Sequence, residues 1–245
     1  MADGDDQQSL SQSIKGRLQE GVQNSVFRDK GLLDPDAVID EDRIVGRDDQ
    51  LDDIITYLRP ALQGNRPPNM LLYGPSGTGK SLIINAVCQQ VLELANSQGD
   101  RFGVIKINCQ TIKSHDRAVY RLVKNAAEEA GVDVGVPDSG ISTDQKLNRF
   151  YEILSNNFDS VIIILDEVDL LVGRQRDPND KPAYSKLLYQ LSRASQLGRI
   201  EGHVSVAALT NDPRFMEDLD GRAESSFNPQ DVVFPDYDAN QLQSI

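Results

Sequence analysis

The sequence has 245 residues, 39% of them hydrophobic and 26% charged, a balance typical of globular proteins and unlike collagen-like or wholly disordered chains. Its net charge of −13 argues against a nucleic-acid partner, unless the protein works in molar salt, where the Debye length falls to ~3 Å. Two cysteines and two histidines exclude a disulfide scaffold and a multi-histidine zinc site, and no apolar run reaches the ~20 residues of a membrane helix. These features favour an intracellular protein.

The chain begins with a polar segment rich in Gln, Ser and Asp, residues 1–24, for which we predict a flexible tail. Asp48 is then predicted to cap a helix that runs to Leu58. Beyond it, short apolar runs alternate with helical patterns, which indicates a parallel sheet covered by helices. The expected strands are Met70–Tyr73, Val104–Ile107, Val161–Leu165, Val204–Leu209 and Val232–Phe234, and the expected helices are Lys80–Ala95, Asp116–Ala130, Thr143–Asn156 and Ala183–Leu197.

A phosphate-binding loop lies between the first predicted strand and the helix that follows it. The sequence GPSGTGKS matches the pattern G-x-x-x-x-G-K-[ST], in which glycines let successive N–H groups point at phosphate oxygens. Lysine then reaches the β- and γ-phosphates, and the serine hydroxyl ligates Mg²⁺. A chance glycine-rich turn is the alternative. The predicted nucleotide-binding residues here are Gly74, Pro75, Ser76, Gly77, Thr78, Gly79, Lys80 and Ser81.

Two carboxylates follow the most apolar predicted strand, in the sequence IIILDEVD. Since ligands bind at the carboxyl ends of parallel strands, Asp166 and Glu167 are expected beside the phosphate loop. Asp166 suits Mg²⁺ coordination through water, because this ion keeps much of its hydration. Glu167 suits orienting and deprotonating the attacking water. The alternative is two solvated residues that end a strand.

Two further polar residues are candidates for the same chemistry. Asn211 follows a strand and could hold the attacking water or the γ-phosphate, although an ordinary turn asparagine would look the same. Arg222 could reach the γ-phosphate of an adjoining subunit as an arginine finger, or could be solvated. We predict Glu167, Asn211 and Arg222 as catalytic residues, and Ser81 and Asp166 as metal ligands.

In this order, the phosphate loop, DEVD, the strand-end asparagine and the later arginine resemble the AAA+ ATPases. More narrowly, the segments 27–51, 107–111, 165–171 and 219–242 resemble the archaeal replication initiators related to origin recognition complex subunits and the cell-division-cycle initiator ATPase. The acidity suggests a salt-loving archaeon. The resemblance implies an α/β fold, an AAA+ P-loop base domain with a five-stranded parallel sheet sandwiched by helices, at residues 25–236. Residues 237–245 would start a helical lid, without the rest of that lid or a winged-helix domain.

The resemblance also implies functional assignments. Val45 and Tyr237 would contact the nucleotide, ATP or ADP with Mg²⁺, and the protein would be a weak ATPase. A helical insertion at 114–157 would touch the DNA backbone, although a solvated surface is the alternative for its basic residues. Expected partners are double-stranded origin DNA, replication proteins such as the replicative helicase, and a second copy through Arg222, with no membrane and with a cytoplasmic, nucleoid-associated location. A regulator acting on a protein partner, or a non-hydrolysing paralogue, remains an alternative. The insertion's basic residues, with the one just before it, are Lys113, Arg117, Arg121, Lys124, Lys146 and Arg149.

Overall fold

A parallel five-stranded sheet is the centre of the computed structural model, which describes residues 46–173 and 180–237. The strand order is β2-β3-β4-β1-β5, and every neighbouring pair is parallel. The prediction of a five-stranded parallel sheet is therefore confirmed. The strands are β1 (Met70–Tyr73), β2 (Phe102–Asn108), β3 (Ser160–Asp166), β4 (His203–Thr210) and β5 (Gln230–Val233).

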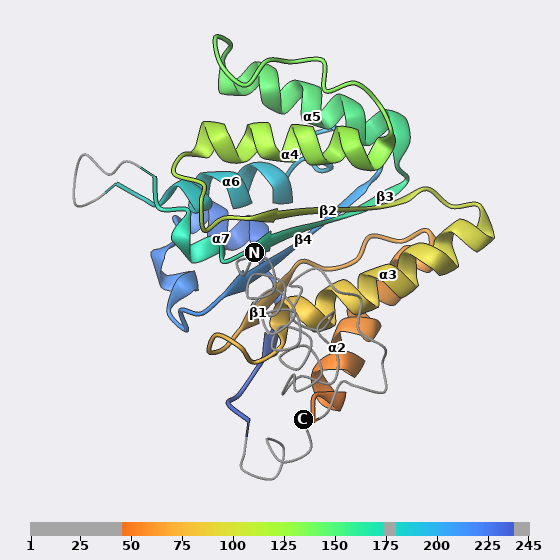
Figure 1. Cartoon of the computed structure of the whole chain (residues 1–245), viewed down its shortest axis with the longest axis vertical. Coiled ribbons are helices and arrows are strands. Elements are labelled where there is room, and N and C mark those ends of the chain that lie inside the picture. Colours follow the sequence, from red (N-terminus) through yellow and green to blue (C-terminus); the bar gives the residue numbers. More distant parts are fainter. Residues whose placement is uncertain (1–45, 174–179, 238–245) are drawn as a thin grey trace, which may run out of the picture. The chain divides into compact units, whose positions relative to one another are not determined.

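Helices cover both faces of this sheet, which explains why the central strands are apolar on both sides. All seven residues of β3 are buried. Ile162 and Ile164 face the core under α2 (Asp48–Leu58) and α3 (Lys80–Gln98), whereas Ile163 and Leu165 face the core on the opposite side. Figure 1 shows α2 and α3 below the sheet and the other long helices above it. Those on the second face are α4 (His115–Ala130), α5 (Thr143–Asn157), α6 (Ala183–Ser192) and α7 (Gly221–Phe227).

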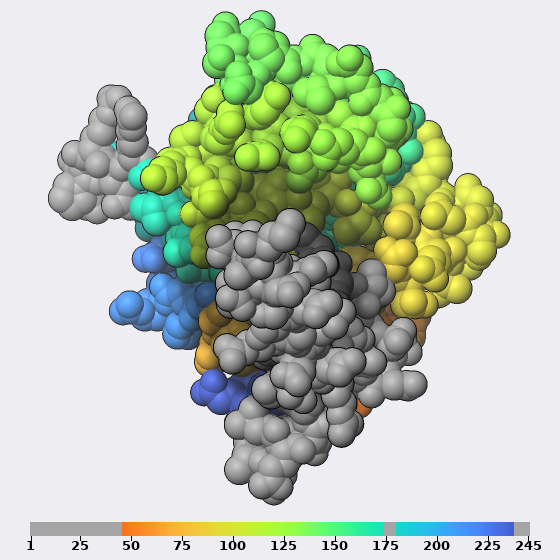
Figure 2. Space-filling view, viewed as in Figure 1, coloured from red at the N-terminus to blue at the C-terminus, as the bar shows by residue number. Residues whose placement is uncertain are grey.

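The two helices between β2 and β3, α4 and α5, are both capped at their N-termini by serine side chains. The Ser114 side chain accepts a hydrogen bond from the backbone N–H of Arg117 at the start of α4. Ser142 and Gln145 form a capping box at the start of α5. In Figure 2 these two helices make up the green upper surface of the molecule.

Two predicted helix boundaries are wrong. Asp48 does not cap α2: it is the first helical residue, and Arg47 stands at the cap position without a side-chain cap bond. The helix α6 ends at Ser192 and not at Leu197, because bonds such as Ala194 N–H to the Leu191 carbonyl tighten the chain into turns. Short 3₁₀ segments at Arg59–Gln63, Val168–Leu170 and Phe215–Asp218 complete the described elements.

Three predictions fall outside the described residues: the tail at 1–24, the position of Val45, and the lid start from residue 238 onward. Within the described part, no helix is both long enough and apolar enough to cross a bilayer.

Candidate nucleotide-binding site

The sheet topology brings three predicted site segments to one edge. Strand β4 lies between β1 and β3, so the residues that follow these three strands are neighbours. Tyr73 at the end of β1 is in register with Thr210, and Leu165 is in register with Ala208. The phosphate loop, Asp166 with Glu167, and Asn211 therefore meet at the carboxyl ends of the strands, where parallel sheets bind ligands.

The phosphate loop starts in close contact with the end of the sheet. Gly74 lies against the backbone carbonyl of Phe234, so that an added Cβ would overlap this oxygen. Phe234 is held there by its N–H bond to the Tyr73 carbonyl, 2.8 Å. Gly79, at the cap position of α3, has φ 94°, a conformation that favours glycine. Both glycines are thus required by backbone geometry, while Pro75, Ser76 and Gly77 at the crest of the loop are exposed.

Lys80 connects the phosphate loop to Asn211. Its Nζ donates to the carbonyls of Gly74 (2.6 Å) and Pro75 (2.8 Å) and to Oδ1 of Asn211 (2.8 Å). The residue is only 7% exposed. Burial lowers the pKa of its ammonium group, and the carboxylates of Asp166, Asp169 and Glu167 act in the opposite direction. Asn211, predicted to hold the attacking water or the γ-phosphate, thus lies beside Lys80, 131 positions away in the sequence.

Glu167 combines an uncommon backbone conformation with an unpaired carboxylate oxygen. Its φ of 50° lies in the left-handed region, which is uncommon for a non-glycine residue. Its Oε2 atom is buried and has no hydrogen-bond partner, and Oδ1 of Asp169 is in the same condition. A buried carboxylate oxygen without a donor fits a site that supplies one from a ligand or a water molecule.

Asp166 lies at the floor of the same site and is 8% exposed. Its backbone carbonyl accepts from the N–H of Cys109, whose thiol is fully buried. Burial raises the pKa of Cys109 to about 12, with further contributions from Asp166, Asp169 and Glu167, so this cysteine is a packing residue. In the described segments, no three acidic, histidine or cysteine side chains are grouped to hold a metal alone.

Arg222 is not brought to the phosphate loop. Its side chain is 81% exposed on α7, 3.8 Å from the Asp220 carboxylate. Its guanidinium carbon lies 5.6 Å from the centre of the Tyr189 ring on α6. Arg222 therefore projects from the surface and reaches no other predicted site residue of its own chain within the described segments.

Arg47 is a site residue that the sequence reasoning missed. It is 1% exposed, and its Nε donates to the carbonyl of Thr78 in the phosphate loop, 3.0 Å. Its guanidinium carbon lies 3.9 Å from the centre of the Tyr237 ring. An arginine next to a glycine before a helix was the available signal, but nothing in the spacing marks it as buried.

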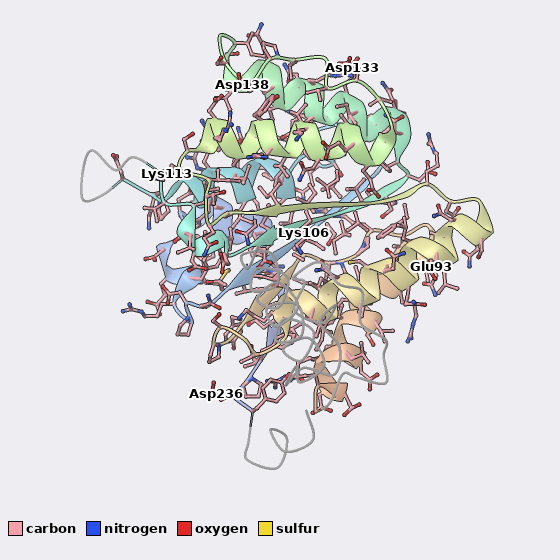
Figure 3. The ribbon with its side chains drawn as sticks, viewed as in Figure 1. Glu93, Lys106, Lys113, Asp133, Asp138 and Asp236 are labelled. Carbon is pink, nitrogen blue, oxygen red and sulfur yellow. The ribbon has the colours of Figure 1, made fainter. Side chains whose placement is uncertain are left out.

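Several basic residues proposed for DNA contact instead hold α4 and α5 together. Lys146 is 1% exposed, and its Nζ binds the Asp116 carboxylate and the Asp138 carbonyl, both at 2.7 Å. Arg117 pairs with the Asp138 carboxylate at 3.0 Å, and Arg149 donates to the carbonyls of Val134 and Asp133. Figure 3 shows Asp133 and Asp138 in the connection between the two helices. Lys146 is therefore not available to a DNA backbone.

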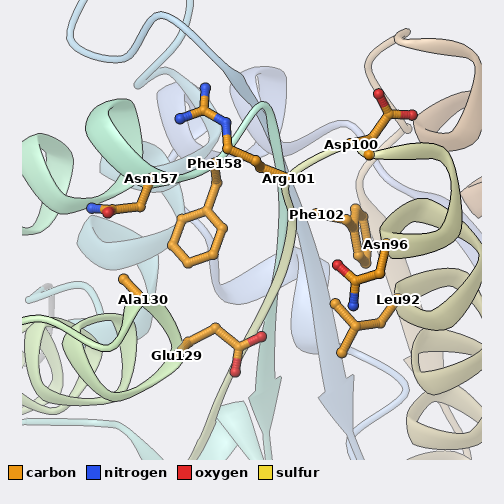
Figure 4. Close-up of a pocket in the computed structure, with 10 residues that line it drawn as sticks. Leu92, Asn96, Asp100, Arg101, Phe102, Glu129, Ala130, Asn157 and Phe158 are labelled. Atoms are coloured by element: carbon orange, nitrogen blue, oxygen red, sulfur yellow. The ribbon is translucent and has the colours of Figure 1, made fainter.

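A cavity of about 470 Å³ lies at the other end of the sheet, where β2 begins. Figure 4 shows it between the ends of α3 and α4. Because the phosphate loop follows the carboxyl end of β1 and all strands are parallel, this cavity is remote from the predicted site. Its lining includes Asn96, Arg101, Phe102, Glu129 and Phe158.

Taken together, the sheet, the loop and the strand-end residues define a P-loop nucleotide-binding domain of the α/β class. The model of the ATPase family associated with various cellular activities (AAA) matches residues 70–230. ORC1-type DNA replication protein 5 of Halobacterium salinarum is 63% identical over 221 residues, which are 90% of this chain and 51% of that protein. ORC1-type DNA replication protein 2 of the same organism is 36% identical over 220 residues, 90% of this chain and 79% of that protein.

Among solved structures, the ORC1 protein of Aeropyrum pernix in complex with DNA is similar, with a TM-score of 0.73 and 32% identity. The match covers 89% of this chain and 52% of that one. The chain belongs to the AAA family and, within it, to the ORC1-type DNA replication proteins. It spans about half the length of the first relative and of the solved structure. The predicted family is confirmed, and the Halobacterium relatives agree with the salt-loving source suggested by the acidity.

Proposed function

We propose that this chain carries the ATPase core of a DNA replication initiator, which binds ATP or ADP with Mg²⁺ and hydrolyses ATP slowly. The observation that carries the proposal is the arrangement around Lys80. A buried ammonium group lies between the phosphate loop and Asn211, opposite Asp166 and Glu167, and a carboxylate oxygen of Glu167 has no protein partner. This arrangement supports phosphate binding and positioning of water.

Each residue has a separate part in this proposal. The N–H groups of residues 76–81 surround the phosphates, and Lys80 leaves the loop carbonyls to contact the β- and γ-phosphates. Asp166 and the Ser81 hydroxyl would hold Mg²⁺, which when bound neutralises charge on the phosphate oxygens. Glu167 orients the attacking water and takes its proton, while Asn211 holds the water or the γ-phosphate. Val45 and Tyr237 contact the rest of the nucleotide.

The proposed partners follow from the family. The related Aeropyrum protein was solved in complex with DNA, and this supports double-stranded origin DNA as a partner. The exposure of Arg222 supports a role at the γ-phosphate of a second copy, and replication proteins such as the replicative helicase are further partners. The proposed location is the cytoplasm, at the nucleoid.

Replacing Lys80 by alanine tests the nucleotide site. We expect a tenfold to hundredfold loss of ATP affinity, because one charge-assisted phosphate contact is worth ~1.5–3 kcal/mol. Isothermal titration calorimetry of both proteins measures it, with Lys186→Ala, on the exposed side of α6, as a charge-matched control. Equal affinity in the parent and in Lys80→Ala would place the phosphates elsewhere.

Replacing exposed basic residues near α4 tests the DNA contact. Lys113 and Arg121 are exposed, whereas Lys146 is buried, so Lys113→Ala with Arg121→Ala should weaken duplex binding for all sequences alike. The measurement is fluorescence anisotropy of labelled duplexes at several matched salt concentrations, because phosphate contacts are salt-dependent. Arg59→Ala, at an exposed residue of the 3₁₀ segment Arg59–Gln63, is the control. Unchanged binding by the double variant would remove this surface from the proposal.

A further inference from the structure

Arg47 is a buried arginine with an unusual set of partners. Its exposed fraction is 1%, and among the described residues no carboxylate lies within ion-pair distance of its guanidinium. Burying a charged group is costly unless it is well satisfied, and an apolar side chain would fill the same space without that cost. The contacts of Arg47 that the structure describes are to backbone carbonyls and to an aromatic ring.

The guanidinium of Arg47 joins two segments that are distant in sequence. Nε donates to the Thr78 carbonyl at 3.0 Å, and a terminal nitrogen donates to the Pro235 carbonyl at 2.6 Å. The same group stacks on Tyr237, with 3.9 Å from its central carbon to the ring centre. We call Phe234–Tyr237, through which the chain leaves β5, the exit segment. Arg47 is thus bonded at once to the phosphate loop and to the exit segment.

Other contacts make this connection short and stiff. The exit segment already touches the loop at Gly74, which packs on Phe234, and near Gly79, where an added Cβ would lie 3.4 Å from the Tyr237 hydroxyl. Thr78 is tied within the loop by its hydroxyl bond to the Pro75 carbonyl, 2.8 Å. Lys80 binds the same Pro75 carbonyl. When Lys80 turns toward a phosphate, it releases the Pro75 carbonyl, to which the Thr78 hydroxyl is also bonded. A shift of this carbonyl therefore moves Thr78, and the bond from Arg47 to the Thr78 carbonyl passes the movement to Arg47.

We propose that Arg47 is a positioning residue that couples the phosphate loop to the exit segment, so that nucleotide binding changes the surroundings of Tyr237. This inference rests on the proposed nucleotide binding. The planar guanidinium donates in two fixed directions and stacks on a ring at the same time, which an ammonium group cannot do. Lysine at this position would keep the charge and lose the coupling.

A single tryptophan makes the coupling measurable, because the chain contains none. Tyr237→Trp keeps an aromatic face for the guanidinium and serves as the parent protein. With MgATP or MgADP, its emission should change with the same midpoint as binding measured by calorimetry. In the Arg47→Lys and Arg47→Met versions of this parent, affinity should fall roughly tenfold, and the emission change at saturating nucleotide should be clearly smaller than in the parent, because only direct contact between the nucleotide and residue 237 remains.

Arg66→Met is the matched control. Arg66 also donates to two backbone carbonyls, those of Val204 and Ser192, but at the start of β4, away from the loop. In the Tyr237→Trp parent, the Arg66→Met substitution should lower the unfolding temperature and leave the nucleotide-induced emission change intact. Should Arg47→Met fail to fold, Arg47→Lys decides the question alone.

The outcomes separate the two proposals. Parent-like affinity together with a parent-like emission change in the folded Arg47 variants would overturn the coupling and leave nucleotide binding standing. An emission change as large as the parent's at saturation in those variants, even with weaker binding, would mean that the nucleotide acts on residue 237 by direct contact alone, and would also overturn the coupling. Absence of binding to the parent would overturn the proposed function and, with it, this inference.

Discussion

Glu167→Gln is expected to abolish ATP turnover and to leave nucleotide binding close to that of the parent. Glutamine keeps the shape of the glutamate side chain but cannot take a proton from the attacking water, and general-base catalysis contributes about 10²–10⁴-fold to a rate. Single-turnover hydrolysis of labelled ATP, with calorimetry for binding, measures both quantities. Glu93→Gln on the exposed side of α3, far from the loop in Figure 3, makes the same charge change and should turn over ATP normally. Parent-like hydrolysis by Glu167→Gln would mean that another group activates the water.

The backbone of Glu167 allows a second test. Since this residue has φ 50° and a buried oxygen without a partner, Glu167→Gly should raise the free energy of unfolding by about 1 kcal/mol while also abolishing turnover. Chemical denaturation without nucleotide measures this. A residue with a purely structural role would instead destabilise the protein when its side chain is removed, so a lower free energy of unfolding would count against a strained catalytic position.

Gly74→Ala is expected to have the largest effect on stability. The new Cβ would overlap the Phe234 carbonyl, a backbone atom that cannot rotate away because the Phe234 N–H is bonded to Tyr73. Overpacking of this kind costs about 2 kcal/mol or more, and the displaced loop should also lose affinity for nucleotide. Denaturant unfolding gives the free energy of unfolding, and calorimetry on the same preparation gives the nucleotide affinity.

Gly64→Ala separates the clash from the backbone effect. Gly64 has φ 69° but no atom within 4 Å of an added Cβ, so its substitution should cost only about 1 kcal/mol through backbone strain. If Gly74→Ala costs no more than Gly64→Ala, the contact between the phosphate loop and the exit segment is loose, and the stiff connection inferred for Arg47 loses its support.

The sequence by itself determined the fold class and the parts of the site that are local. The phosphate loop is contiguous, and its glycines encode the backbone conformations that it needs. The apolar run of β3 required a strand buried on both faces, which placed Asp166 and Glu167 at a strand end. Parallel strands bring such ends to one edge, so Asn211 could be expected at the same edge as Lys80, but their contact depends on β4 lying beside β1, which only the tertiary structure shows.

Tertiary structure alone decided which groups the long polar side chains meet. Periodicity and spacing record which face of an element is buried, but they do not record the partner of a lysine or arginine, which is set by contacts between distant segments. Lys146 thus became a buried tie between α4 and α5 in place of a DNA contact, and Arg222 projects from the surface. Nothing in the sequence marked Arg47 as buried, because its partners at Thr78 and Pro235 lie 31 and 188 positions away and meet it only where β5 pairs with β1.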